Sequence, residues 1–228
     1  MKRGDLIWAG LLAAIITCLL LPETHGAFVS ATKAHPYIMG FIKVAVLATM
    51  GELLALRIAR GTWKRPAGLV WRSAIWGLLG ISFVTVFEVF ALGVTGAVNR
   101  GLLPGGSASV SKVVTAFWIS TIMNLTFAPT MMALHRVTDT WIDLAHTRLP
   151  GASQVRLREV VGTIDWQGFV SFVVVKTIPL FWIPAHTITF LLPPEYRVLM
   201  AAMLSIALGA ILAFAKRNAA PRANAAGA

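Results

Sequence analysis

The sequence predicts an all-α protein, a polytopic transmembrane helix bundle of about six spans with both termini on the inner side of the membrane. Hydrophobic residues make up 57% of the 228 residues and charged residues only 13%, whereas about a quarter of an average soluble domain is charged. Apolar runs of roughly the 20 residues that a helix needs to cross a bilayer recur along the chain. The cationic connectors between these runs favour one side. We therefore expect a single transmembrane domain over residues 1–217.

The first span is predicted over residues 6–22, after the basic start Met1-Lys2-Arg3. A cleaved signal peptide can begin in the same way, but no clean A-x-A cleavage site follows, which favours an uncleaved anchor. The second span is predicted over residues 36–58, because proline is tolerated in the first turn of a helix and an apolar run follows it.

The third span is predicted over residues 71–98, and a Gly/Pro/Ser loop over 99–111 separates it from a fourth span over 113–134. Clustered Gly, Pro and Ser residues are typical of loops. The longest polar stretch, residues 135–165, follows the fourth span and is expected to contain a short helix over 153–161.

The fifth span is predicted over residues 166–192 and contains Pro179 and Pro184. Proline frees backbone carbonyls within a helix, so this segment is either an ordinary kinked helix or a broken helix of the kind that transporters use to build substrate sites. A sixth span is predicted over residues 198–215. The Ala-, Arg- and Asn-rich tail over 218–228 is predicted to be disordered.

The distribution of basic residues gives the orientation. Fourteen of the 20 Lys and Arg residues lie in the segments assigned to the inside and two within spans; the four assigned to the outside are Lys33, Arg100, Lys112 and Arg197. This bias agrees with the positive-inside rule. Topology therefore accounts for the formal charge of +11, and nucleic-acid binding is not expected. The Arg- and Ala-rich composition and the lack of a transit peptide favour a bacterial cytoplasmic membrane.

Four ionisable residues fall within predicted spans: Lys43, Glu52, Glu88 and Lys176. Charges at membrane depth are costly unless they are paired or face water, which makes them functional candidates. Matching depths predict two ion pairs, Lys43 with Glu88 and Glu52 with Lys176, around a central second span. These residues would either line a polar path or serve as structural ion pairs, and depth alone does not distinguish the two.

Small residues recur at four-residue spacing in the sixth span, at Ala201, Ser205, Gly209 and Ala213. Such a stripe lets helix backbones approach closely in lipid. It would pack either within the bundle or between protomers of a homo-oligomer.

The sequence contains no catalytic motif that we recognise. The five histidines are scattered, and neither H-E-x-x-H nor G-x-S-x-G occurs. One helical face would carry His135, Asp139, Asp143 and His146, which is more often a solvated continuation of the fourth span than a metal site. We therefore predict no enzymatic activity, no metal and no cofactor.

Short motifs in matching order resemble the Mpv-type family of small mitochondrial inner-membrane and peroxisomal membrane proteins. The positions that carry the resemblance are Ala34-His35-Pro36, Gly51-Glu52, Phe127-Ala128-Pro129, Trp182, Pro184-Ala185, Phe190, Pro193 and Tyr196-Arg197. The resemblance implies a compact bundle of about four family helices, to which the first span is an addition. It also implies weakly selective channel or transport activity of unsettled substrate.

Two functions are therefore expected from the sequence. The leading hypothesis is a small channel or solute-permeation protein in the lipid bilayer, with Lys43, Glu52, Glu88 and Lys176 lining or gating a polar path. The alternative is a non-transporting structural or assembly protein in which the same charges only hold the bundle together.

Overall fold

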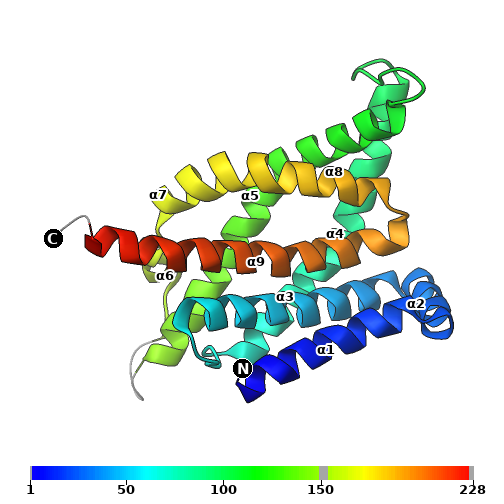
Figure 1. Cartoon of the computed structure of the whole chain (residues 1–228). Helices are drawn as coiled ribbons and strands as arrows, with labels where there is room; N and C mark the ends of the chain where they lie inside the picture. The colour runs from blue at the N-terminus through cyan, green and yellow to red at the C-terminus, as the bar shows by residue number, and fades with distance from the viewer. Residues whose placement is uncertain (1, 149–153, 226–228) are drawn as a thin grey trace.

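The computed structural model describes residues 2–148 and 154–225 of the chain, the last eleven of these as backbone only. The described part is helical and contains no strands. Six helices are long and apolar enough to cross a membrane: Arg3–Leu20, Pro36–Arg60, Leu69–Asn99, Ser111–Thr147, Trp166–Leu191 and Pro194–Phe214. The predicted fold class, a six-span helix bundle, is confirmed (Figure 1).

Between the first two spans, the structure places a helix that the sequence analysis did not predict. The first span, α1 (Arg3–Leu20), is followed by α2 (Pro22–Ala34) and then by the second span, α3 (Pro36–Arg60). Both corners fall at X-Pro bonds, where the residue before proline is pushed out of the helical region. Accordingly, Leu21 is extended (φ −69°, ψ 127°) and His35 is non-helical (φ −133°, ψ 61°).

The third and fourth spans, α4 (Leu69–Asn99) and α5 (Ser111–Thr147), are longer than predicted. Helix α5 continues for more than ten residues beyond the expected end of its span, so the polar face from His135 to His146 is a continuation of the fourth span. Gly68 adopts φ +62° at the start of α4, and the space beside its Cα is filled by Ile142 and His146. The connector before α4 therefore touches the end of α5.

The fifth span is one continuous helix of three parts. It consists of α7 (Trp166–Gly168), the π-helix η1 (Phe169–Trp182) and α8 (Ile183–Leu191), preceded by the short helix α6 (Leu157–Thr163). The wide turns of η1 surround Pro179, the first of the two prolines predicted to interrupt this span. π-Helical turns are rare and frequently occur at functional sites.

The last helix, α9 (Pro194–Ala225), extends into the tail that was predicted to be disordered. Alanine has the highest intrinsic helix propensity, and it supplies much of this segment. Only residues 226–228 of the predicted tail lie outside the described residues.

Helix α3 packs between α4 and α9, whereas α5 packs against α4 and α8. Glycines allow the closest approaches: a Cβ on Gly40 would lie 2.8 Å from the carbonyl oxygen of Gly80, and one on Gly51 would lie 3.0 Å from the Cα of Ile206. Gly209 of the small-residue stripe in turn faces the carbonyl of Gly51. At Gly209 the stripe therefore packs within the bundle, against α3, which is the first of the two alternatives considered for it.

Polar contacts tie α1 to the same end of the bundle as the two basic connectors. The Arg57 guanidinium donates to Asp5 Oδ1 at 2.8 Å, and the Trp63 indole donates to the same oxygen at 2.7 Å. The indole of Trp8 donates to the carbonyl of Met50 at 2.9 Å. We refer to this end as the inner end, and to the end that carries α2 as the outer end.

Candidate functional site: a central cavity and an outer cavity

A cavity of about 360 Å³ lies in the middle of the bundle, lined by residues of α3, α4, α5, η1, α8 and α9. We call it the central cavity. Aromatic and methionine side chains form most of its wall, and polar groups lie at its middle and at its inner end. A mostly apolar cavity with a few convergent polar groups is the usual form of a small-molecule site.

The polar group at the middle of the central cavity is a buried Asn–His pair. Asn124 of α5 is fully buried, and its amide nitrogen donates to the carbonyl of Ser120 at 2.8 Å. The same amide lies 3.1 Å from Nδ1 of His186 on α8. Trp182 stacks on the His186 ring with the centroids 5.0 Å apart. The wide π-helical turns end at Trp182, so the indole and the imidazole reach the cavity from successive turns.

Four buried ring nitrogens in the wall of the central cavity have no hydrogen-bond partner within the described part of the chain. Two of them belong to the stacked pair, Nε2 of His186 and Nε1 of Trp182, and both of these residues are 8% exposed. The other two are Nδ1 of His135 and Nε1 of Trp76. Leaving a buried polar atom unpaired costs about 1–3 kcal/mol. Unpaired ring nitrogens at a cavity wall are therefore well placed to bind a polar group on a solute.

A cluster of carboxylates surrounds Arg72 of α4 at the inner end of the central cavity. The guanidinium, 6% exposed, lies 3.3 Å from Glu52 of α3, 3.0 Å from Asp139 of α5 and 2.5 Å from Asp143 of α5. Glu52 and Asp139 also line the central cavity. The Glu52–Lys176 pair was therefore predicted wrongly: the cation at the depth of Glu52 is Arg72, at the start of the next span.

The outer cavity, of about 430 Å³, lies at the other end of the bundle. Lys43 and Glu88 both line it, but the described contacts include no ion pair between them, so this predicted pair is also wrong. Phe87 lines the outer cavity and the central cavity alike, and it is 5% exposed. Its ring therefore forms the wall between the two.

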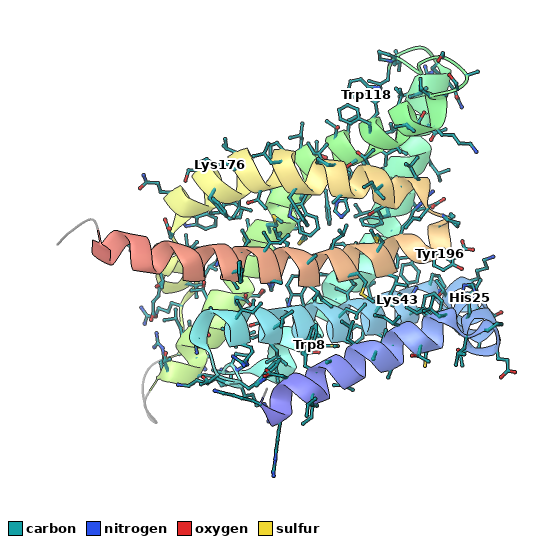
Figure 2. All side chains as sticks on the ribbon, viewed as in Figure 1. Trp8, His25, Lys43, Trp118, Lys176 and Tyr196 are labelled. Atoms are coloured by element: carbon teal, nitrogen blue, oxygen red, sulfur yellow. The ribbon has the colours of Figure 1, made fainter. Side chains whose placement is uncertain are left out.

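Only one of the four predicted charges is buried. Lys43 is 6% exposed, Glu52 is half-buried, and Glu88 and Lys176 are exposed. Figure 2 shows Lys176 on the outward side of its helix. It lines neither cavity, because its position on the helix directs it away from the bundle axis. The structure thus brings Lys43 and Glu88 to one cavity and Glu52 to the other, and leaves Lys176 apart.

The positions that carry the family resemblance are distributed over both cavities and over helix ends. His35 and Pro36 form the corner before α3, and Pro193 lies just before α9. Lining positions among them are Pro36 and Arg197 in the outer cavity, and Gly51, Phe127 and Trp182 in the central cavity. Phe190 packs on Phe87 at 5.3 Å, Pro129 lies within α5, and Pro184 lies in the first turn of α8.

Residues that the sequence analysis did not select for the site include Asn124, His186, Arg72 and Phe87. Asn124 gave one signal, an amide in the middle of an apolar span. Arg72 gave another, since it lies within the first turn of a span.

Among the described residues, no three His, Cys, Asp or Glu side chains lie close enough together to hold a metal ion.

A scan against protein-family models returned no match, and searches of curated proteins and of solved structures returned none either. The fold alone gives the class of protein: its six long apolar helices define an integral membrane protein of six helical spans.

Proposed function

We propose that this protein is a small channel or transporter that lets a solute cross the membrane through its two cavities. The observation that carries the proposal is the position of Phe87: one buried ring is shared by a cavity at the outer end and a cavity that reaches the inner end. Two half-paths that meet at a narrow apolar barrier are the arrangement expected of a closed permeation pathway.

The barrier is built from aromatic side chains of α4 and α8. Phe87 stacks with Phe83 at 5.8 Å, and it contacts Phe190 at 5.3 Å and His186 at 5.7 Å. The last contact joins the barrier to the polar middle of the central cavity. A solute held by His186 would therefore lie directly against the barrier that it must pass.

Replacing Phe87 with alanine is expected to join the two cavities and to raise solute leak at least several-fold. Removing the ring opens the shared wall, and hydrophobic constrictions are what hold such pathways shut. The measurement is efflux of small fluorescent and radiolabelled solutes from proteoliposomes. Because a large-to-small core change costs about 3–5 kcal/mol, each preparation is first checked for a monodisperse, helical protein.

The matched control is Phe83→Ala. Phe83 lies one turn earlier on the same helix, is similarly buried at 8%, and lines the central cavity alone. Its removal enlarges one cavity without joining the two. Equal leak in both variants would mean that loosened packing, not the shared wall, controls permeation.

A structural or assembly role is the second candidate, and a specific observation favours it. Ion pairs at the inner end join several helices: Arg72 binds three carboxylates, and Arg57 binds Asp5. Such contacts fix the packing of α1, α3, α4 and α5 without any solute. Under this alternative Glu52→Gln would alter stability, while flux through reconstituted protein would stay at the level of empty liposomes.

We also propose membership of the Mpv-type family, absence of enzymatic activity, and residence in a bacterial cytoplasmic membrane with both termini inside. The motifs in matching order support the first, and the lack of a catalytic motif supports the second. The Arg- and Ala-rich composition supports the bacterial membrane, and the basic connectors support the inside position of both termini.

Orientation is directly testable. In a Cys18→Ser background, cysteines at the exposed positions Thr62 and Gly162 are expected to react with impermeant maleimide only after cells are opened, whereas one at Ala108 reacts in intact cells. Labelling of positions 62 and 162 from opposite sides would contradict the topology.

A further inference from the structure

We infer that the outer cavity binds a single negatively charged oxyanion, a carboxylate or a phosphodiester, carried on an apolar body. The groups that would hold the anion are the ammonium of Lys43 and the hydroxyl of Thr32. Both line the cavity, one from α3 and the other from α2. Figure 2 shows Lys43 at the outer end, in the region of the labelled His25 and Tyr196.

The first observation is a buried ammonium whose charge is not neutralised within the described part of the chain. Lys43 is 6% exposed. Its Nζ donates one long hydrogen bond, 3.4 Å, to the backbone carbonyl of Glu195, and it lies 4.6 Å from the centre of the Phe28 ring. An ammonium has three donors, and a buried cation without an opposite charge is strongly disfavoured. An anion in the cavity would supply both the charge and the missing acceptor.

The second observation is an unpaired hydroxyl in the same cavity. Thr32 is 9% exposed, and its Oγ1 has no hydrogen-bond partner among the described residues. The first residues of two long helices, Pro36 of α3 and Pro194 of α9, also line the cavity. Helix N-termini carry partial positive charge and favour anions. These features act in the same direction as the ammonium.

The other charged residues of the cavity indicate that the ligand carries a single negative charge. Lys33 forms an ion pair with Glu195 at 3.4 Å. Arg197 lies within Coulombic range of Glu88. The three cations and two carboxylates therefore leave one positive charge, that of Lys43, to be balanced. A dianion would overcompensate it.

The apolar part of the cavity wall indicates the kind of molecule to which the anionic group is attached. Pro36, Val84, Phe87 and Val198 are apolar, and the cavity has room, at about 430 Å³, for an alkyl segment as well as a head group. Two sources share this chemistry: a free fatty carboxylate and the head group of an anionic phospholipid. The inference does not rest on permeation, because binding is measured without transport.

The test is calorimetric titration of decanoate and of dihexanoyl phosphatidylglycerol into the full-length protein in neutral maltoside micelles, with empty micelles subtracted. A charge-assisted hydrogen bond corresponds to about 10- to 100-fold in affinity. We expect Lys43→Met to weaken binding by that factor and Thr32→Val by several-fold, while Lys176→Met leaves it unchanged. Binding of decanoate alone assigns the site to a free carboxylate, and binding of phosphatidylglycerol alone assigns it to a lipid.

The uncharged probes decanol and dihexanoyl phosphatidylcholine separate anion recognition from simple partition. Affinity for them equal to that of the anions, or full affinity in Lys43→Met, overturns the inference. Thermal unfolding without added ligand shows whether Lys43→Met loses affinity because it lacks the ammonium or because its structure is weakened. Relief of an unneutralised buried charge is expected to leave Lys43→Met at least as stable as the parent, whereas a lysine retained only for its contacts with Phe28 and Glu195 would give a less stable variant.

Discussion

Replacing Arg72 with methionine will destabilise the bundle by about 3–5 kcal/mol. The guanidinium is buried among Glu52, Asp139 and Asp143, and its Nε donates to the carbonyl of Ala67 at 3.1 Å. Methionine preserves the volume but leaves carboxylates without a counter-charge at the end of a cavity. The expected loss is several times the value of about 0–1 kcal/mol for an exposed ion pair. Equilibrium unfolding in mixed detergent micelles, followed by circular dichroism, measures it.

Two further variants decide what the loss at Arg72 means. Arg136→Met removes an exposed arginine that also borders the central cavity, and it is expected to cost little. Adding Glu52→Gln and Asp139→Asn to Arg72→Met should restore most of the stability, because the two less exposed carboxylates are then neutral and Asp143, at 60% exposure, is solvated. If the triple variant remains as unstable as the single one, the packing of the arginine, and not its charge, holds these helices together.

Replacing Gly80 with valine will separate α3 from α4 and is expected to cost about 1–3 kcal/mol or more. A Cβ at this position would lie 2.8 Å from the Cβ of Val44, and it would also meet the backbone of Gly40. Backbone atoms cannot move aside as a flexible side chain can, so the two helices must shift. The unfolding assay used for Arg72 reports the cost, and Gly80→Ala provides a milder step if the valine variant does not fold.

Gly93 is the matched control, since it lies on the same helix and has no atom within 4 Å of its Cβ position. Gly93→Ala is expected to be neutral or to stabilise the helix by up to about 1 kcal/mol, the difference in helix propensity. Equal costs at Gly80 and Gly93 would show that the close approach of α3 and α4 does not limit stability.

Hydrophobic run length was enough to predict the spans, because the bilayer sets a minimum length for each helix. It did not predict α2, whose sequence from Pro22 to Ala34 mixes polar and small residues without a clear apolar face. It also placed the end of the fourth span at residue 134. Helix α5 runs on to Thr147, since polar residues can continue a helix into water once lipid no longer surrounds it.

The candidate site was only partly predictable. Depth along a span follows from residue number, but ion pairing also depends on the direction in which a side chain points around the helix axis. Glu52 and Lys176 were matched by depth, yet Lys176 points away from the bundle and Glu52 points toward Arg72. Phe87 illustrates a further limit: nothing in an apolar span distinguishes the one ring that separates two cavities from the rings that fill the core.

The order in which the helices pack has a mechanical consequence. Helices α3, α4 and α9 form one slab, and α5, η1 and α8 form another, with the two meeting along α4–α5 and α8–α9. The central cavity straddles this seam, whereas the walls of the outer cavity come from the first slab and from α2 and its neighbouring corners. Rocking of one slab against the other would therefore change the shape of the central cavity around His186. The outer cavity around Lys43 would move with the first slab as a rigid unit.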